Sequence, residues 1–114
     1  MEAIQLTAIF QIKPGKIQEF KELANKCIET VKEKDTGTLQ YDWFYNADES
    51  ECHVRETYSN SEAILQHAGN VGPFLGPLLE ITTFSLKLYG NASEELKGAL
   101  SAFDMEYYSF AGGI

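Results

Sequence analysis

The sequence predicts an α+β sandwich in which helices cover one face of a four-stranded antiparallel sheet. Apolar residues alternate with polar ones along four segments, as they do in half-buried strands, and recur at helical spacing in two segments between them. The resulting order, βαββαβ, is that of a ferredoxin-like fold, in which the middle strands of two βαβ halves form a hairpin. With 114 residues, a single domain is expected over 1–114, with its core at about 3–90 and a C-terminal extension of one helix and one strand at 91–114.

The first half of the fold begins with a strand over residues 3–12. Every second side chain of this segment is apolar, and these side chains share one face: Ile4, Leu6, Ala8, Phe10 and Ile12. After a turn at 13–16 the apolar positions change to helical spacing: Ile17, Phe20, Ala24, Cys27, Ile28 and Val31. The sequence therefore predicts an amphipathic helix that packs on the sheet and ends before a second turn at 35–37.

A hairpin follows, with strands over 38–46 and 51–58 and a polar turn at 47–50. One face of its first strand is predicted to carry Leu39, Tyr41, Trp43 and Tyr45. The matching face of its second strand carries Cys52, Val54, Glu56 and Tyr58. His53 and Arg55 are predicted on the opposite face, either at the surface or in an interface between subunits.

The second helix is predicted to begin at Asn60 or Ser61, both of which can cap a helix. Its apolar side consists of Ala63, Ile64, His67, Ala68 and Val71. The Gly-Pro pair at 72–73 is expected to interrupt the helix, because these two residues are the strongest local breakers of regular structure. A further apolar turn or short helix is expected over 74–79, kept irregular by a second Gly-Pro pair at 76–77.

The fourth strand is predicted over 82–89, where apolar and polar residues alternate again. Beyond it, Ser93 is expected to cap a short helix that runs to about residue 101. The aromatic segment 105–110 is predicted to be extended, and the final residues to be frayed.

The acidic composition argues against several classes of partner. The net charge is −8 and the calculated isoelectric point about 4.6, whereas nucleic acids and anionic membranes attract clustered lysine and arginine. No run of about 18 apolar residues occurs, and the N-terminal residues lack the basic region and cleavage site of a signal peptide. A cytoplasmic protein is therefore expected, in which Cys27 and Cys52 are buried thiols and not a disulfide.

The outer face of the predicted sheet is too apolar to be left in water, since Ile9, Phe44 and Tyr89 lie on it. A second copy of the chain is the simplest cover for such a face, so a homodimer packed sheet to sheet is expected. The C-terminal tail, with its aromatic residues Tyr107, Tyr108 and Phe110, is long enough to reach across and seal this interface.

Three motifs point to a known family. The segment 37–42, GTLQYD, resembles the G-x-L-x-Y-x opening of the second strand in the antibiotic biosynthesis monooxygenase (ABM) family. Residues 56–67 are similar to that family's E-x-[WY]-x-x-x-E-A-x-x-x-H pattern, which ends here at His67, and 84–90 resembles its last core strand and glycine. The resemblance implies a dimeric α+β barrel with one cavity per subunit, between sheet and helices. Members of the family include cofactor-free quinol or anthrone oxygenases, haem degraders and proteins of no known activity.

His67 and Glu56 are the candidate catalytic residues. Histidine has an unperturbed pKa near neutrality and suits the role of a general base, and Glu56 would be a carboxylate in an apolar setting. Both also have a structural interpretation, as a hydrogen-bonded core histidine and as a buried anchor. The candidate substrate-binding residues are mainly aromatic and apolar: Tyr41, Trp43, Tyr58, Ile64 and Phe74.

No cofactor or metal is expected, because the sequence has no dinucleotide or phosphate loop, no metal-ligand spacing and no nucleophile elbow. The first hypothesis is a cofactor-free monooxygenase that acts on a small quinol or phenol. The second is a dimeric module that binds a small aromatic ligand without turnover. The third is a haem-binding or haem-degrading protein with His67 as the iron ligand. The haem hypothesis is disfavoured because haem-degrading relatives carry an asparagine in the first strand and a tryptophan pattern near the second helix, neither of which occurs here.

Overall fold

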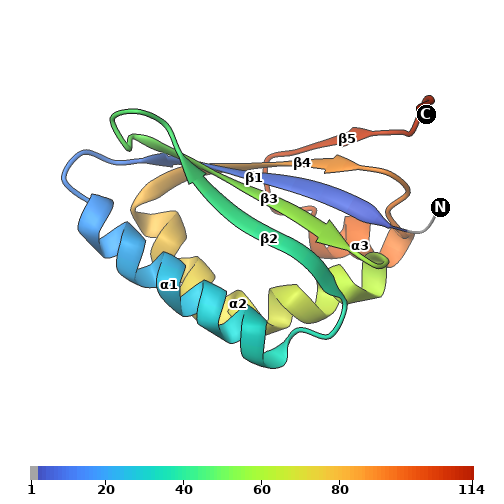
Figure 1. The fold of residues 1–114 in the computed structure, drawn as a ribbon, viewed down its shortest axis with the longest axis horizontal. Coiled ribbons are helices and arrows are strands. Elements are labelled where there is room, and N and C mark those ends of the chain that lie inside the picture. Colours follow the sequence, from blue (N-terminus) through green and yellow to red (C-terminus); the bar gives the residue numbers. More distant parts are fainter. Residues whose placement is uncertain (1–2) are drawn as a thin grey trace.

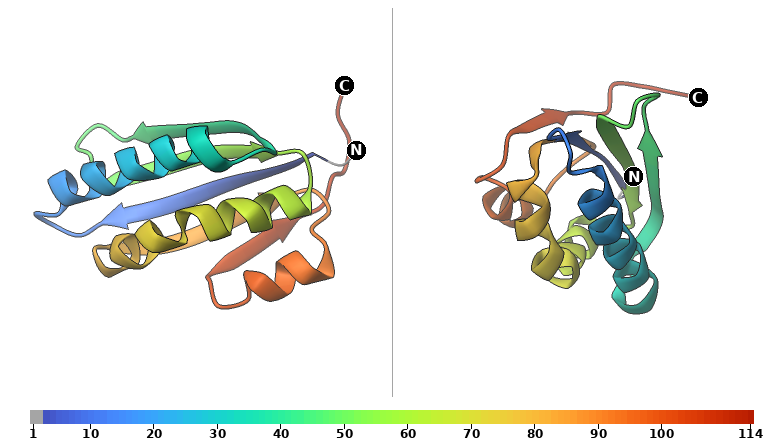
Figure 2. Two further views of the ribbon diagram at one scale, coloured as in Figure 1. Left: turned by 90° about the horizontal axis from the view of Figure 1, so that it is seen from below. Right: turned by 90° about the vertical axis from the view of Figure 1, so that its left-hand side faces the viewer.

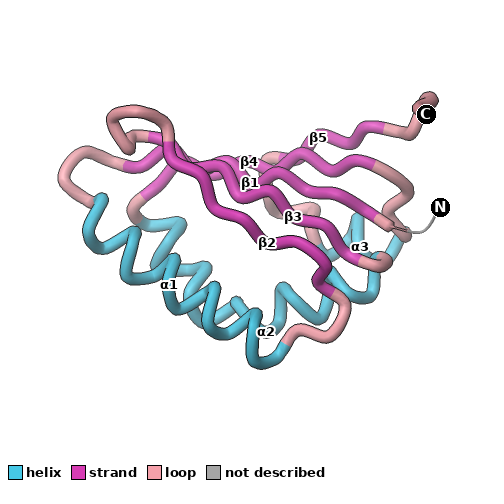
Figure 3. The backbone as a smooth tube through the Cα atoms, in the orientation of Figure 1, coloured by secondary structure: helices cyan, strands magenta, loops and turns pink. Residues whose placement is uncertain are grey.

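The computed structural model describes residues 3–114 and confirms the α+β fold (Figure 1). Its elements are β1 (Ile4–Ile12), α1 (Ile17–Lys34), β2 (Thr38–Tyr45), β3 (Glu51–Tyr58), α2 (Ser61–Glu80), β4 (Thr82–Tyr89), α3 (Glu94–Ala99) and β5 (Met105–Tyr108). The strand order in the sheet is β2-β3-β1-β4-β5. All three helices lie on the same side of the sheet, and no helix lies on the other side (Figures 2 and 3).

The sheet has five strands, one more than the four that the sequence predicts. The fifth is β5, which pairs in parallel with β4, from Leu86 opposite Met105 to Tyr89 opposite Tyr108. The C-terminal extension is therefore part of the chain's own sheet up to residue 108. Tyr107 and Tyr108 belong to this strand, while Phe110 lies beyond it and is 69% exposed.

Helix α2 runs without a break from Ser61 to Glu80, so the predicted interruption at residues 72–73 and the irregular segment at 74–79 are both wrong. A proline disfavours helix at the preceding residue through contacts with that residue's backbone and Cβ. Glycine precedes both prolines of this helix, at positions 72 and 76, and has no Cβ to clash. A single long helix thus crosses the inner face of the sheet.

The inner face of the sheet follows the predicted alternation with one exception, Leu39. The pairing of β2 with β3 shifts register between Thr38 and Gln40, which leaves Leu39 as the extra residue of a β-bulge. Leu39 is consequently 66% exposed and does not share the buried face with Tyr41 and Trp43 as predicted.

The core lies between the inner face of the sheet and the helices. Its largest fully buried side chains are Tyr58, Phe20, Ile4, Leu78, Leu88 and Leu96. Cys27 and Cys52 are both free and buried, as predicted. Within residues 3–114, no helix combines the length and the apolar character that crossing a membrane requires.

Candidate functional site

An apolar cavity of about 80 Å³ lies between the inner face of the sheet and helix α2. Strands β1 to β4, both long helices and the segment after α3 all contribute to its wall. Its polar or titratable side chains are few: Cys27, Tyr41, Trp43, Glu56 and His67. The remaining wall is formed by Leu6, Ala8, Phe10, Val54, Ile64, Ala68, Val71, Leu75, Leu78, Phe84, Leu86, Leu100 and Phe103. A few converging polar groups in an otherwise apolar pocket are typical of a ligand site.

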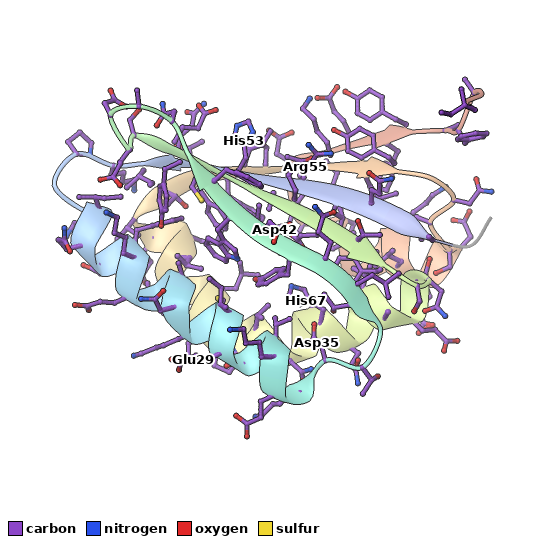
Figure 4. All side chains as sticks on the ribbon, in the orientation of Figure 1. Glu29, Asp35, Asp42, His53, Arg55 and His67 are labelled. Carbon is purple, nitrogen blue, oxygen red and sulfur yellow. The ribbon has the colours of Figure 1, made fainter. Side chains whose placement is uncertain are left out.

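His67 is held by Asp35 at one end of this cavity. The two side chains meet where the C-terminal end of α1 passes α2, on the helix side of the sheet (Figure 4). His67 Nδ1 lies 2.8 Å from Asp35 Oδ2, and the Asp35 side chain is only 1% exposed. A second hydrogen bond joins the same two segments: the backbone N–H of Thr36 donates to the Gln66 side chain over 3.0 Å.

Asp35 is surrounded by hydrogen-bond donors. Thr38 Oγ1 donates to Oδ2 over 2.6 Å, and Asn70 Nδ2 donates to Oδ1 over 2.8 Å. Burial on its own would raise the pKa of Asp35, but the hydrogen bonds from Asn70, Thr38 and His67 outweigh it and lower that pKa. Asp35 is thus ionised at neutral pH and can only accept hydrogen bonds. It follows that Nδ1 of His67 carries the proton and donates a hydrogen bond to Asp35.

The other ring nitrogen of His67, Nε2, is consequently the one with a free lone pair. Burial lowers the pKa of His67, and the hydrogen bond and negative charge of Asp35 offset this only in part. The imidazole is therefore neutral at physiological pH. The rings of Tyr41 and Tyr58 flank it, with centroids 5.0 and 5.3 Å from the imidazole. A neutral imidazole with a fixed tautomer has the properties of a general base.

Glu56 faces Nε2 of His67 from strand β3. Its Oε1 is 3.8 Å from that nitrogen, which is too long for a hydrogen bond, and accepts a hydrogen bond from the Tyr58 hydroxyl. Burial raises the pKa of Glu56 to about 8, against the lowering effect of the Tyr58 hydrogen bond, and the charge of Asp35 adds to the rise. At neutral pH the site thus holds a protonated carboxyl group beside an unprotonated imidazole.

The aromatic part of the wall forms a continuous row across the sheet. Ring centroids are 5.7 Å apart from Tyr41 to Trp43, 6.0 Å from Trp43 to Phe10 and 4.7 Å from Phe10 to Phe84. Trp43 Nε1 is the one buried side-chain nitrogen or oxygen in residues 3–114 that has no hydrogen-bond partner. The row forms an aromatic floor of stacked, tilted and edge-on rings, against which an aromatic ligand can pack.

Five of the seven predicted site residues come together around the cavity: Glu56, His67, Tyr41, Trp43 and Ile64. Tyr58 is fully buried; its hydroxyl group donates a hydrogen bond to Glu56, and its ring lies against the imidazole of His67. Phe74 lies outside the lining, because the unbroken helix α2 turns Leu75 and Leu78 toward the cavity in its place.

Several residues of the site have no clear signal in the sequence. Asp35 lies in the turn after α1, where an aspartate is unremarkable, and its partner His67 is 32 positions away. Asn70 is one turn after His67 on α2, a spacing that places both on one side of a helix. Leu100 and Phe103 come from the C-terminal extension, which the motifs do not reach.

His53 and Arg55 lie on the opposite face of the sheet from His67, as predicted (Figure 4). His53 Nε2 is 2.6 Å from Glu51 Oε2, and both side chains are partly exposed. An open hollow of about 450 Å³ adjoins them, lined by Gln40, Phe44, Tyr45, Asn46, Glu51, His53 and Arg55. In the described residues, 3–114, no three His, Cys, Asp or Glu side chains are arranged to hold a metal ion.

The fold is that of a small α+β protein with an apolar cavity between its sheet and its helices. The family model of the antibiotic biosynthesis monooxygenases matches residues 4–71, which is more than half of the chain. The chain therefore belongs to the antibiotic biosynthesis monooxygenase family. No curated protein matches it significantly in sequence.

Solved structures with the same fold include MupZ from Pseudomonas fluorescens, at 20% identity and a TM-score of 0.87, covering 100% of this chain and 94% of MupZ. Rv0793 from Mycobacterium tuberculosis is 21% identical with a TM-score of 0.71, covering 82% and 98% of the two chains. A candidate antibiotic biosynthesis monooxygenase from Caulobacter crescentus CB15 is 18% identical with a TM-score of 0.70, covering 81% and 92%. At these identities the likeness shows the fold alone.

Proposed function

We propose that this chain is a monooxygenase that oxidises a small phenol or quinol with O₂ and needs no metal or flavin of its own. The observation that carries the proposal is the state of His67. Its Nδ1–H donates a hydrogen bond to Asp35, and its unprotonated Nε2 faces an apolar cavity with an aromatic floor. Membership of the monooxygenase family supports the same reaction class.

The chemistry begins with a proton transfer. His67 Nε2 removes the hydroxyl proton of the substrate, and the resulting phenolate is electron-rich enough to transfer an electron to O₂. A carbon–oxygen bond then forms at a ring carbon that carries hydrogen. Cleavage of the O–O bond releases water and leaves a quinone carbonyl, so that phenol and O₂ give quinone and H₂O. The apolar wall keeps bulk water away from the anion and the oxygen adduct.

Glu56 has a second role in this proposal. Because its pKa is raised to about 8, it is mostly protonated at neutral pH and can donate a hydrogen bond to the substrate oxygen as negative charge develops there. Tyr41, Trp43 and Ile64 hold the ring against the floor of the cavity. Tyr58 is a positioning residue, through its hydrogen bond to Glu56 and the contact of its ring with His67.

The size of the cavity limits the substrate. Pockets for drug-sized ligands enclose roughly 300–1,000 Å³, whereas this one encloses about 80 Å³. A single ring is thus the class of ligand that fits the site in this form. Haem, the third hypothesis, does not fit a space of this size although His67 has a free ring nitrogen.

We further propose that two chains pair through the uncovered face of the sheet. Phe44 is 55% exposed there, and Ile9 is only half-buried at its centre. Burial of this face would remove apolar surface from water and enclose the hollow beside His53. The cavity itself lies on the other side of the sheet, so each subunit would keep a separate site.

The test is oxygen consumption with a panel of single-ring hydroquinones and phenols, under air and under nitrogen. Wild-type protein is expected to consume one O₂ for each quinone formed, and His67→Gln to lose most of this activity. His53→Gln is the matched control, because it changes the other histidine of the chain, which lies on the outer face. Saturable binding of the panel without oxygen uptake would instead identify a non-catalytic binding module.

A further inference from the structure

We infer that Phe103, in the C-terminal extension, sets the maximum length of the substrate that the cavity accepts. The inference deepens the proposed function and rests on the same cavity. Among the phenols and quinols of the proposed function, it favours a single-ring phenol with a short apolar substituent opposite its hydroxyl group over a 1,4-hydroquinone, which carries a second hydroxyl group at that position. Phe103 lies outside the part of the chain that the family model matches, which ends at residue 71.

The extension is attached firmly enough to act as a wall. The backbone N–H of Ser93 donates to Ser61 Oγ over 3.0 Å, which joins the start of α3 to the start of α2. Leu96 and Leu100 are 1% and 6% exposed. Beyond them β5 pairs with β4.

Phe103 itself is fixed on both sides. Its backbone N–H donates to the Leu100 carbonyl over 3.1 Å, and the next residue, Asp104, accepts from the Leu86 N–H over 2.9 Å. Its ring meets Phe84 edge-on, with centroids 5.7 Å apart and planes at 80°. The side chain is therefore held in contact with the cavity lining by its own backbone and by a neighbouring ring.

Phe103 and His67 lie at opposite ends of the aromatic floor. His67 contacts Tyr41 on β2, and Phe103 contacts Phe84 on β4. Strands β2 and β4 are three steps apart in the sheet, which corresponds to about 14 Å at ~4.8 Å per step. A ring whose hydroxyl group reaches His67 thus points its far side toward β4 and Phe103.

The wall at the Phe103 end contains no polar side chain. Phe84, Leu86, Leu100 and Phe103 form it. A charged or hydroxylated group there would lose its hydration without finding a partner, which disfavours polar substituents at that position. An alkyl group is favoured until its length brings it against the Phe103 ring. The small volume of the cavity, about 80 Å³, indicates that only a short alkyl group fits without contacting the Phe103 ring.

The experiment is equilibrium binding of a series of 4-n-alkylphenols, from methyl to octyl, measured by calorimetry. For the wild-type protein, affinity is expected to rise by up to about fourfold for each buried methylene and then to fall at a cut-off length. Phe103→Ala should move the cut-off to longer chains by two or more carbons, and Phe103→Trp should move it to shorter ones. Phe103→Leu provides a milder enlargement in case the alanine variant does not fold.

Phe110→Ala is the matched control, because it removes the same side chain from the same extension at a position that is 69% exposed. Its cut-off should equal that of the wild type. An unchanged cut-off in the folded Phe103 variants overturns the inference, and so does a complete absence of binding across the series. Binding requires no turnover, so a shifted cut-off without oxygen uptake would reject the proposed reaction and keep Phe103 as the length-determining residue. Oxygen uptake together with one common cut-off in all variants would keep the proposed reaction and reject Phe103 as the length-determining residue.

Discussion

Nδ1 of His67 lies 2.8 Å from Oδ2 of Asp35, although 32 residues separate the two in the chain. Asp35 directly follows the last residue of α1, and His67 lies on the inner side of α2. Their contact thus joins the two helices at one end of the cavity. It also decides which nitrogen of the imidazole is available to a ligand, because an ionised Asp35 can only accept a hydrogen bond, which fixes the proton on Nδ1.

The first prediction concerns the ionisation of His67 in Asp35→Asn. The hydrogen bond and the charge of Asp35 both raise the pKa of His67 and so oppose the effect of burial. Removing the charge should lower that pKa below its wild-type value, which itself lies below the ordinary 6.5. The imidazole signals in an NMR pH titration measure this directly.

Two further measurements on Asp35→Asn distinguish a role of Asp35 in orienting the His67 imidazole from a role in stability alone. The substitution should increase the Nε2–H tautomer in the ¹⁵N spectrum and reduce kcat with phenols by roughly 10- to 100-fold, with a smaller effect on KM. Asp42→Asn is the control, since Asp42 lies on the outer face of the sheet. A His67 titration unchanged by Asp35→Asn would show that the contact has no electrostatic role.

The second prediction concerns the stability of Glu56→Gln as a function of pH. The pKa of Glu56 is raised from its ordinary value to about 8 in the folded protein. The stabilisation that comes from the bound proton is therefore complete below the unfolded pKa of about 4.5 and is lost as pH rises through about 8. His67, with its lowered pKa, changes charge at and below about pH 6.5, so the interval from 6.5 to 8 reports mainly on Glu56.

Urea unfolding over that interval is the measurement. The wild-type free energy of unfolding should fall by roughly 1–2 kcal/mol between pH 6.5 and 8, because the folded state holds a proton on Glu56 that the unfolded state has already released. Glu56→Gln keeps a neutral side chain of the same shape and should show a flat profile. A flat wild-type profile would mean that Glu56 is already ionised at pH 6.5.

The third prediction is the pH profile of the proposed oxidation. His67 must be unprotonated to act as a base, so the rate should rise through a pKa below 6.5 and then level off. Glu56 must be protonated to donate a hydrogen bond, so the rate should fall again above about pH 8. In Glu56→Gln the decrease above pH 8 should disappear, whereas the rise at low pH should remain. If the rate decreases above pH 8 in both proteins, that decrease belongs to the titration of a group other than Glu56.

The predictable parts of this fold are the strands and helices in which buried side chains recur at a regular spacing along the chain. The alternation in β1 and the helical spacing in α1 follow directly from which side chains face the core. Leu39 breaks that rule because a bulge adds one residue to β2. The break expected at residues 72–73 is absent, and the glycine before the proline removes one of the steric conflicts that a proline causes in a helix, the clash with the preceding Cβ.

The site was partly predictable for the same reason. His67 and Glu56 stand out because each is a titratable residue on an apolar face, and Tyr41 and Trp43 because they are aromatic and point the same way. Asp35 does not stand out, because only the packing of α1 against α2 brings it to His67. Its pKa and its effect on the imidazole tautomer depend on distances that no local pattern contains.

The fourth prediction concerns the turn that positions Asp35. A Cβ added at Gly37 would come within 2.5 Å of Ala63 Cβ and 2.9 Å of Ser59 Oγ, so the turn and the start of α2 would have to move apart. Gly37→Ala should destabilise the protein by roughly 1–3 kcal/mol, measured by urea unfolding. Gly69→Ala is the control, because it lies in α2 with open space around the added methyl group, and it should stabilise by about 0.5–1 kcal/mol. Equal stability of the two variants would contradict the close approach at Gly37.

The fifth prediction concerns the outer face of the sheet. If two chains pair there, the exposed ring of Phe44 is buried between them, and a charge at this position would be desolvated without a partner. Sedimentation velocity at micromolar concentration should give a dimer for the wild type and a monomer for Phe44→Glu. Tyr107→Glu should remain a dimer, since Tyr107 is also partly exposed but alternates with Glu106 and Tyr108 and so lies on the helix side. A monomeric wild type, or a dimer that persists in Phe44→Glu, would place any interface elsewhere on the molecule.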